Sequence, residues 1–404
     1  MIIKPVVQGV VARTCHPVGC KQAVKNQINY VTQQTPAQTG STLPKRVLIL
    51  GASSGFGLSA RTALAFGAAK ADTLGVSFER GISDKSVGSA GWYNNIWFRE
   101  FAEQEGRFAG NIVGDAFSSQ TREQVVDAIK THMGGSVDLV IYSLATGVRP
   151  NPATGDFWRS VIKPVGEPVT GYSVNIEKGT LESVTMPPAS REEIEATEKV
   201  MGGEDWQDWI GWLAGQGVLA DGFRTVAFSY IGPEQTHALY HHGTLGYAKA
   251  HLHKTKDELN QKMASLNGKA DIAVCKALVT KASVFIPGLA PYLLALMNVM
   301  KQQGTHETCI EQMYRLFYER FYTSSNDSTV TDSNGLIRMD DWELSPDTQS
   351  KTIALLEQIN PGNFRQMGDY EGFVKEFMQI NGFFHPEVDY SQPLNLAELK
   401  SLIP

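Results

Sequence analysis

One local feature limits the fold of this chain more than any other: a glycine-rich turn between a buried strand and a helix. The run Arg46–Leu50 is almost entirely apolar, as a strand covered on both faces is. The turn Gly51–Gly57 follows it, and the Ala-rich Leu58–Ala69 predicts a helix. Glycine lets backbone approach a ligand closely, and a helix N-terminus offers free N–H groups to phosphate. We therefore expect the turn to hold a dinucleotide.

Strand-like and helical segments alternate after this turn. Apolar runs predict strands at Thr73–Phe78, Asn111–Val113, Asp138–Leu144 and Thr225–Ile231, and Arg122–His132 has the pattern of an amphipathic helix. Such alternation predicts a doubly wound parallel α/β sheet of the Rossmann type. The glycine spacing, G-x-x-x-G-x-G, is that of short-chain dehydrogenases/reductases. We therefore expect a dinucleotide-binding fold of that type.

The rest of the chain is expected to add to this core. Residues 1–44 should form an N-terminal extension that begins with a short strand pair and ends in a polar connection over 32–44. Residues 45–311 should form the dinucleotide-binding and catalytic domain, with an insertion rich in Pro, Gly and Thr at about 146–190. Residues 312–404 should form a mainly helical region packed on the same domain, with a loop around 324–334.

Composition excludes several functional classes. The net charge of −6 and the absence of a basic block argue against a nucleic-acid surface. Four cysteines are too few for a disulfide framework, which favours a reducing, cytoplasmic setting. The first residues lack the apolar core of a signal peptide. The apolar stretch Val284–Met300 is broken by proline and glycine and is shorter than a typical bilayer span, so we expect no stable membrane association.

The residues at the strand ends indicate which dinucleotide binds. Glu79 follows the second predicted strand, where an acidic residue usually binds the adenosine ribose hydroxyls and repels a 2′-phosphate. This favours NADH over NADPH, although Arg80 could serve a 2′-phosphate and leaves the strictness of that preference open. Asp115-Ala116 and Leu144-Ala145 lie at the ends of the next two predicted strands and are expected to flank the adenine and the nicotinamide ribose.

Reductases of this fold pair a tyrosine, which hydrogen-bonds the substrate oxygen, with a lysine that binds the nicotinamide ribose and lowers the pKa of the tyrosine. The usual Tyr-x3-Lys is absent from the sequence. Wider spacings leave four candidate pairs: Tyr240/Lys249, Tyr247/Lys254, Tyr247/Lys256 and Tyr292/Lys301.

Helix geometry removes the last two of these pairs. Nine positions on an unbroken helix advance roughly 900° and leave the two side chains on opposite faces. Between Tyr240 and Lys249, however, Gly243 and Gly246 could break the helix and let the side chains converge. Seven positions return the Tyr247/Lys254 pair to one face. Spacing alone leaves these two pairs open.

Three other groups of residues are not expected to take part in catalysis or metal binding. Cys15, His16 and Cys20, and the histidines near Tyr240, lack a second ligand pair or an H-E-x-x-H pattern, so we expect no metal site. The tryptophans at helical spacing are expected to pack in the core or a lid: Trp206, Trp209 and Trp212.

Longer motifs carry a family resemblance over nearly the whole chain. They are HPVGC (16–20), VLILGASSGFGLSAR (47–61), GWYNN (91–95), GDAFS (114–118), IYSLA (141–145), KVMGGEDW (199–206), SYIGPE (229–234), KALVTKAS (276–283) and HETCIEQ (306–312). Together they resemble FabV-type enoyl-ACP reductases and the closely similar trans-2-enoyl-CoA reductases. The resemblance implies an enlarged short-chain dehydrogenase/reductase fold and a monomeric protein. It also implies reduction of the 2,3 double bond of an enoyl thioester, carried on acyl carrier protein or CoA, with NADH.

The resemblance also assigns residues. It places the catalytic tyrosine shortly after SYIGPE, which selects Tyr240 as proton donor with Lys249, and it assigns Tyr230 to the substrate. The implied cofactor contacts are Gly51, Ala52, Ser53, Ser54, Gly55, Phe56, Phe78, Glu79, Asp115, Ala116, Leu144, Ala145, Lys249, Leu278, Val279 and Thr280. Two positions depart from the pattern: Gly147 replaces an expected proline near the substrate mouth, and Cys275 replaces an asparagine near the cofactor.

Three alternatives remain at this stage. The first is a trans-2-enoyl-CoA reductase that serves an energy-linked reduction instead of fatty-acid synthesis. The second is a short-chain carbonyl reductase, which would reduce ketones. The third is a catalytically silent dinucleotide sensor, against which an intact Tyr240 and Lys249 argue.

Overall fold

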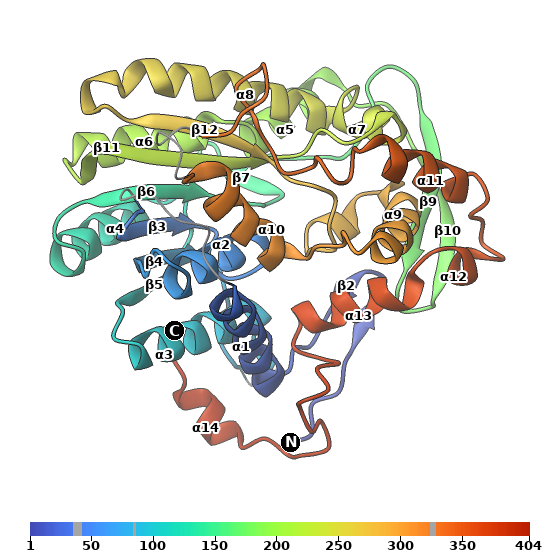
Figure 1. Ribbon diagram of the computed structural model, residues 1–404, viewed down its shortest axis with the longest axis horizontal. Coiled ribbons are helices and arrows are strands. Elements are labelled where there is room, and N and C mark those ends of the chain that lie inside the picture. Colours follow the sequence, from blue (N-terminus) through green and yellow to red (C-terminus); the bar gives the residue numbers. More distant parts are fainter. Residues whose placement is uncertain (35–42, 84–85, 324–328) are drawn as a thin grey trace.

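The centre of the protein is a parallel seven-stranded sheet in a computed structural model that describes residues 1–34, 43–83, 86–323 and 329–404 (Figure 1). The strand order is β13-β12-β11-β6-β3-β4-β5, and every neighbouring pair is parallel. The strands are β3 (Arg46–Leu50), β4 (Asp72–Ser77), β5 (Ala109–Val113), β6 (Val137–Tyr142), β11 (Leu219–Ser229), β12 (Lys269–Val274) and β13 (Ile337–Arg338). The chain leaves β3 in one direction and later returns to its other side, which confirms the doubly wound fold.

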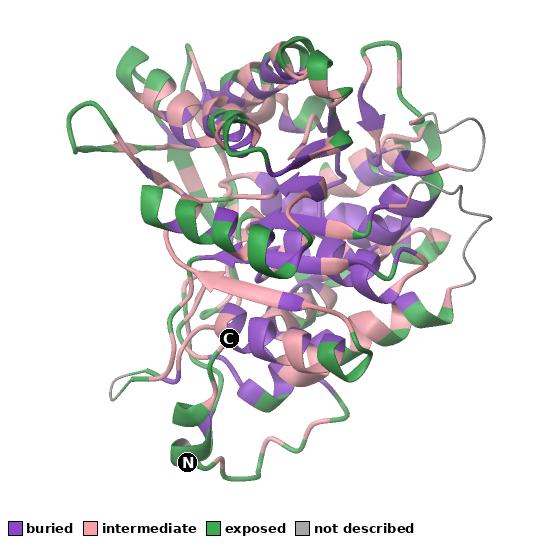
Figure 2. Cartoon of the chain, turned by 90° about the vertical axis from the view of Figure 1, so that its left-hand side faces the viewer, coloured by how far each residue is buried: buried purple, intermediate pink, exposed green. Residues whose placement is uncertain are grey.

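Helices cover both faces of this sheet because successive side chains of each strand point to opposite sides. Val47 and Ile49 of β3 pack with one group of helices, and Leu48 and Leu50 pack with another. The first group contains α1 (Pro17–Gln33), α2 (Gly55–Phe66), α3 (Ala90–Gln104) and α10 (Cys309–Arg315). The second contains α4 (Ser119–His132), α6 (Glu204–Gly215) and α8 (Thr244–Lys262). Figure 2 shows the buried residues concentrated along the sheet and the inner sides of these helices.

The N-terminal residues form the predicted strand pair and one further helix. β1 (Val7–Gln8) pairs antiparallel with β2 (Val11–Ala12), which confirms the prediction. Helix α1 follows, and His16 caps it by accepting a hydrogen bond from the Gly19 N–H at 3.1 Å. Most of the predicted polar connection, 35–42, lies outside the described residues.

Residues 146–190 break the alternation of strands and helices, as their composition predicts. They contain two antiparallel hairpins, β7 (Val148–Pro150) with β8 (Phe157–Arg159), and β9 (Val169–Asn175) with β10 (Thr180–Met186). Helix α5 (Arg191–Met201) then leads back to the sheet, and the side chain and backbone of Ser190 form a capping box with Glu193 at its start.

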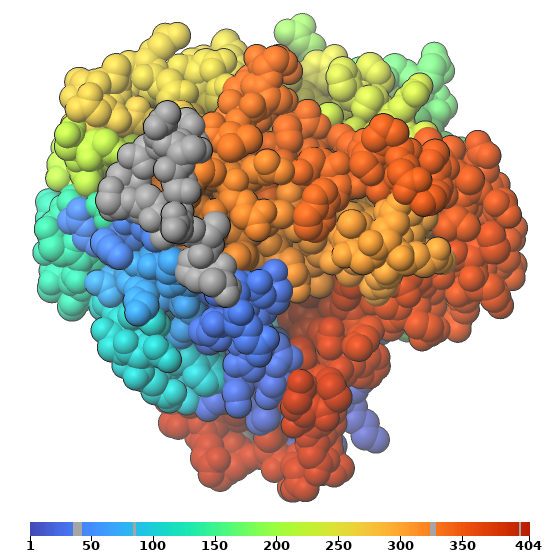
Figure 3. Space-filling model, in the orientation of Figure 1, coloured from blue at the N-terminus to red at the C-terminus, as the bar shows by residue number. Residues whose placement is uncertain are grey.

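The C-terminal region is mostly helical, but it also contributes an edge strand that was not predicted. Its elements are the π-helix Leu316–Phe321, strand β13, and helices α11 (Pro346–Leu356), α12 (Phe364–Met367), α13 (Tyr370–Ile380) and α14 (Leu396–Ser401). Helices α11 to α14 build a third core cluster with α9 (Leu289–Gln303), β9 and β10, whereas the π-helix and β13 belong to the cluster that contains α2 and α10. Figure 3 shows these residues, in orange and red, covering a broad part of one face. No helix within the described ranges is long and apolar enough to cross a membrane.

Several predicted boundaries are wrong by a few residues. The helix after the turn begins at Gly55 and ends at Phe66, and the second strand ends at Ser77, so that Phe78 lies in the following loop and is 80% exposed. Strand β6 ends at Tyr142 and β11 at Ser229. Strand β12 was not predicted, although it pairs with β11 over six residues. Trp206 and Trp209 lie in the core, as predicted, and Trp212 is partly exposed.

Candidate active site

The glycine turn lies at the carboxyl end of β3, against the end of β6. Gly51 has φ +93°, and a Cβ there would lie 2.4 Å from the Ser143 carbonyl oxygen. A Cβ on Gly57 would lie 1.9 Å from the Gly51 carbonyl oxygen. The turn is therefore packed too tightly for side chains at these two positions, and helix α2 begins at Gly55 with its N-terminus facing the same edge. This arrangement fits the pyrophosphate of a dinucleotide.

Glu79 is fixed next to the turn. Its Oε1 accepts a hydrogen bond from the Ser53 hydroxyl at 2.6 Å, and its Oε2 accepts one from the Ser89 hydroxyl. A Cβ on Gly91 would lie 2.0 Å from Oε1, so the GWYNN motif leaves the space that this carboxylate occupies. The Asn94 side-chain amide donates to the Ser53 carbonyl at 2.9 Å. Glu79 is thus fixed beside the turn, whereas Arg80 is exposed.

The other residues assigned to the cofactor follow strands at the same edge of the sheet. Asp115 and Ala116 follow β5, and Leu144 and Ala145 follow β6. Their neighbours fix them: the Phe117 N–H donates to Asp115 Oδ1 at 3.0 Å, and the Trp209 indole donates to the Ala116 carbonyl at 3.1 Å. Leu278, Val279 and Thr280 follow β12 and are buried.

The helix breaks between Tyr240 and Lys249, as Gly243 predicts. Helix α7 (His237–Tyr240) ends at the tyrosine, and α8 begins at Thr244. A Cβ on Gly243 would lie 2.6 Å from the Leu239 carbonyl oxygen, so only glycine fits this break. Gly246 lies inside α8 and does not interrupt it.

The other tyrosine–lysine pairs lie in different settings, either on the surface of α8 or with the two side chains apart. Tyr247 is 45% exposed, and the Lys254 ammonium lies 3.7 Å from Glu258 on the surface. Lys256 is buried and donates to the Asn334 carbonyl, on a different side of α8 from Tyr247. Tyr292 is buried, whereas the ammonium of Lys301 bonds Asp369. The side chains of Tyr247/Lys256 and of Tyr292/Lys301 therefore diverge, as the nine-position spacing on an unbroken helix predicts.

Phe228 joins the lysine to the dinucleotide turn. Its ring lies 5.6 Å from the ring of Phe56, and its carbonyl accepts a hydrogen bond from Lys249 Nζ at 3.1 Å. Burial lowers the pKa of Lys249 to about 8. One turn later on α8, His253 contacts the Ser229 hydroxyl at 2.8 Å, and burial lowers its pKa to about 4.

Tyr240 packs against Tyr230. Their ring centroids are 4.5 Å apart with an interplanar angle of 73°, an edge-to-face contact. Burial, and to a smaller extent the charge of Glu343, raises the pKa of Tyr240. Lys249 donates to a backbone carbonyl instead of to this hydroxyl, so the expectation that the lysine lowers the tyrosine pKa is not met in the protein alone. The phenol stays protonated at neutral pH and can act as a donor.

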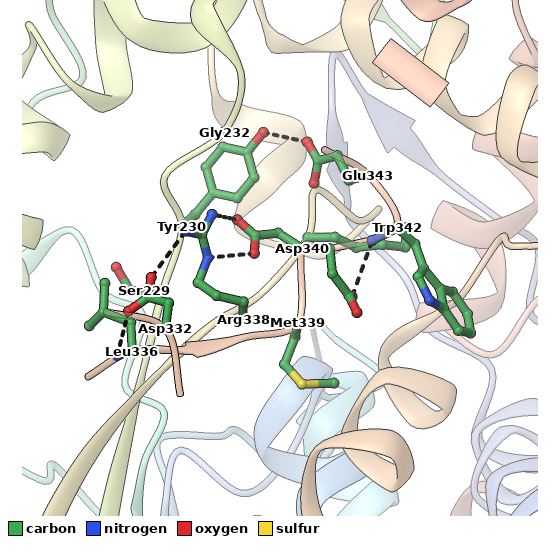
Figure 4. A network of polar contacts seen from close by, with 12 residues as sticks. Ser229, Tyr230, Gly232, Asp332, Leu336, Arg338, Met339, Asp340, Trp342 and Glu343 are labelled. Atoms are coloured by element: carbon green, nitrogen blue, oxygen red, sulfur yellow. Dashed lines mark hydrogen bonds and ion pairs between the residues drawn. The ribbon is translucent and has the colours of Figure 1, made fainter. Parts of the chain in front are cut away.

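Glu343 completes this site and was missed at the sequence level. It is fully buried, and its Oε1 accepts a hydrogen bond from the Tyr230 hydroxyl at 2.9 Å (Figure 4). The same oxygen accepts a second hydrogen bond from the Tyr292 hydroxyl at 2.6 Å. Its Oε2 accepts the Ala277 N–H at 2.7 Å. A single glutamate far along the chain has no spacing to its partners that a motif could reveal.

Two departures from the family pattern occupy different environments. Cys275 is buried directly after β12, its N–H donates to the Ser229 carbonyl at 2.8 Å, and burial raises the pKa of its thiol. Gly147 is exposed, and its carbonyl accepts the Ser160 N–H at 2.9 Å. Among the described residues, no group of three or more His, Cys, Asp or Glu side chains is placed to hold a metal ion.

Family models match the chain almost from end to end. The NAD(P)H binding domain of trans-2-enoyl-CoA reductase matches residues 2–84, the trans-2-enoyl-CoA reductase catalytic region matches 86–322, and the enoyl reductase FAD binding domain matches 331–394. The chain belongs to this enoyl reductase family.

Named relatives and a solved structure agree with this assignment. An enoyl-[acyl-carrier-protein] reductase [NADH] 2 of Photobacterium profundum is 59% identical over 403 residues, covering 100% of both chains. A trans-2-enoyl-CoA reductase [NADH] of Clostridium beijerinckii is 46% identical, again over 100% of both chains. The crystal structure of Clostridium acetobutulicum trans-2-enoyl-CoA reductase in complex with NADH is 42% identical, with a TM-score of 0.96 and full coverage of both chains.

The family descriptions name two cofactors, NAD(P)H and FAD, and the residues of this chain fit the first. The glycine turn and Glu79 fit a nicotinamide dinucleotide. Residues 331–394 carry no second glycine turn between a strand and a helix, and their buried carboxylates are already bound within the protein: Asp340 by Arg338, and Glu343 by the two tyrosines. This segment does not fit a flavin.

Proposed function

We propose that this chain reduces the 2,3 double bond of trans-2-enoyl thioesters with NADH. We assign it the enoyl-ACP reductase role, the last reductive step of fatty-acid elongation, with activity on enoyl-CoA as well. The observation that carries the proposal is the contact of Phe228 with both Phe56 of the dinucleotide turn and the Lys249 ammonium. This contact links the cofactor turn to the lysine of the proposed pair, and the relatives of this chain that match over their full length are named NADH-dependent enoyl reductases.

The chain's own groups then have defined tasks. Bound NADH supplies the hydride that adds to the β-carbon of the enoyl thioester. As negative charge develops on the thioester oxygen, the protonated Tyr240 donates a hydrogen bond to it. Protonation at the α-carbon, with Tyr240 as the proton donor, completes the reduction. Losing one such donor typically raises the barrier by roughly 3–4 kcal/mol. Lys249 holds the nicotinamide ribose, and Tyr230 contacts the substrate.

The cofactor contacts follow the edge of the sheet. Glu79 binds the adenosine ribose and disfavours a 2′-phosphate, and the exposed Phe78 lies next to it. The turn binds the pyrophosphate. Adenine and nicotinamide are flanked by the remaining proposed contacts: Asp115, Ala116, Leu144, Ala145 and residues Leu278–Thr280.

The wider setting is also proposed. The substrate is carried on acyl carrier protein or CoA, the protein is a cytoplasmic monomer, and residues 1–44, 45–311 and 312–404 work as one unit. The packing of α1 on α2 and α10, and of the C-terminal helices on α9, supports that last point. The resemblance to the enoyl reductases supports the monomer.

Replacing Tyr240 with phenylalanine tests the assignment of the proton donor. We expect NADH binding to stay close to that of the wild type while turnover of crotonyl-CoA falls by about 10²–10³-fold. NADH binding is measured by fluorescence and turnover by absorbance. The matched control is Tyr247→Phe, on the exposed face of α8, which should keep wild-type turnover. Retained turnover in Tyr240→Phe would refute the assignment.

A further inference from the structure

Glu343 comes from a part of the chain distant from the rest of the site, yet it connects three of its elements. It holds Tyr230 directly after β11, Tyr292 in α9, and the backbone N–H of Ala277 directly after β12. Figure 4 shows the carboxylate reaching the Tyr230 hydroxyl from the segment that also carries Asp340. With 0% of its surface exposed, it exchanges none of these donors with water.

The surroundings of Glu343 hold it in one place. Gln349 donates to the Tyr292 hydroxyl at 3.0 Å and to the Glu343 carbonyl at 2.7 Å. Burial raises the pKa of the Glu343 carboxyl, and its hydrogen-bond donors together with the nearby Lys276 ammonium counteract that rise in part. The buried Lys276 ammonium itself bonds the Ala277 carbonyl at 3.1 Å. Glu343 therefore forms a buried acceptor that is compensated by charge and by three hydrogen-bond donors.

The two tyrosines of the site differ in whether their hydroxyl can still donate a hydrogen bond. A phenol has one proton to donate. The Tyr230 hydroxyl already donates its hydrogen bond to Glu343, so it has no second one to donate to a substrate oxygen. The Tyr240 hydroxyl bonds no other described group, and the Tyr230 ring packs edge-on against the Tyr240 ring. A shift of Tyr230 would therefore displace Tyr240 as well.

Gly232 shows how closely Tyr230 is seated. A Cβ on Gly232 would lie 2.7 Å from the Tyr230 hydroxyl and 2.6 Å from its Cε1, and Gly232 has φ +71°. The phenol thus lies between this glycine on one side and Glu343 on the other.

We propose that Glu343 is a positioning residue that accepts the hydrogen bond of the Tyr230 hydroxyl and fixes its ring, so that, of these two tyrosines, Tyr240 alone has a hydroxyl proton free for the substrate oxygen. This role rests on the proposed enoyl reduction. Glu343 also ties the Ala277 backbone, and with it the loop that leads to Leu278–Thr280, to the tyrosine side of the site.

The test is a double-mutant cycle between Glu343→Gln and Tyr230→Phe. The side-chain oxygen of glutamine can still accept a hydrogen bond from the Ala277 N–H. The NH₂ group of the glutamine then faces the tyrosine hydroxyls and cannot accept hydrogen bonds from them. We expect Glu343→Gln to lower kcat by about 10–100-fold, because small misplacements of reacting groups have effects of that size. The double variant should be within about threefold of Tyr230→Phe, because no hydroxyl remains at position 230 to be misplaced.

The matched control is Asp340→Asn. Asp340 lies in the same segment and is equally buried, but it bonds Arg338. Its effect on kcat should multiply with that of Tyr230→Phe. If the fold-losses of kcat in Glu343→Gln and Tyr230→Phe simply multiply in the double variant, the proposal is overturned. It is also overturned if Asp340→Asn and Tyr230→Phe depart from multiplication by as much as Glu343→Gln and Tyr230→Phe do.

A second readout separates this proposal from the proposed function. The same cycle is measured on the thermal unfolding midpoint and on NADH binding by fluorescence. If the wild type reduces no enoyl thioester, the proposed function fails; non-additive midpoints for Glu343 and Tyr230 would then still support the assigned contact, and additive midpoints would overturn it. In an active enzyme, the midpoint shifts of Glu343→Gln and Tyr230→Phe could be non-additive while their losses of kcat simply multiply. That combination would show that Glu343 supports the structure only, and it would overturn the positioning role.

Discussion

Lys249 gives NADH binding a pH dependence that can be worked out from the structure. Burial lowers the pKa of its ammonium from the usual 10.5 to about 8, so the positive charge is present below pH 8 and is lost as the pH rises through that value. If the charged form binds the ribose hydroxyls, about nine-tenths of the protein is competent at pH 7 and about one-tenth at pH 9. The Kd for NADH should therefore rise about tenfold between these values, or about 1.4 kcal/mol.

The groups around Lys249 do not titrate in this range. Burial lowers the pKa of His253 to about 4, which keeps the ring neutral, and it raises the pKa of both the Cys275 thiol and the Tyr240 phenol. The same shift predicts the sign of the effect on stability. Between pH 8 and 10.5 the unfolded chain binds a proton that the folded protein does not, so the apo-protein should gain stability from this residue as the pH rises.

The assay is a fluorescence titration with NADH at half-unit steps from pH 6.5 to 9.5, on the wild type and on Lys249→Met. Methionine keeps most of the length and apolar volume of the lysine but has no charge. The wild type should show the tenfold rise in Kd, whereas the variant should bind more weakly with a flat profile. A flat wild-type profile, or the same slope in both proteins, would refute the assignment of this titration to Lys249.

Two further predictions concern the cofactor turn. Glu79→Gln should narrow the preference for NADH over NADPH by at least about tenfold, because placing like charges together costs several kcal/mol; unchanged ratios of kcat/KM for the two cofactors would contradict the role of this carboxylate. Gly51→Ala should destabilise the protein by roughly 1–3 kcal/mol and weaken NADH binding, since a Cβ would lie 2.4 Å from the Ser143 oxygen at φ +93°. Thermal unfolding measures the change, and Gly211→Ala on α6, where a Cβ meets nothing within 4 Å, is the control that should show no loss.

The parts of this protein that depend on neighbouring residues could be predicted from the sequence. The apolar run of β3, the glycines after it and the start of α2 are continuous in the chain, and each local preference agrees with the fold. Gly243 predicted the break that separates Tyr240 from Lys249. Short-range patterns also gave the fold class, although they misplaced element ends by a few residues.

The rest depends on contacts between distant parts of the chain. Glu343 lies 113 residues from Tyr230 and 51 from Tyr292, and no spacing rule relates such positions. The pKa of Tyr240 depends on how deeply the fold buries it, which the tyrosine–lysine spacing does not reveal. The edge strand β13 has only two residues, too few for a periodic pattern. The choice between the two remaining tyrosine–lysine pairs likewise required the family resemblance and the exposed setting of Tyr247.

The most direct test of the central claim is the loss of NADH absorbance with purified protein and three substrates: crotonyl-CoA, an enoyl thioester of acyl carrier protein, and a ketone. The account predicts NADH oxidation with at least one of the two thioesters and none above background with the ketone. Oxidation with the ketone alone would identify a carbonyl reductase. Tight NADH binding without oxidation by any of the three would identify a dinucleotide sensor, and either result would contradict the proposed enoyl reduction.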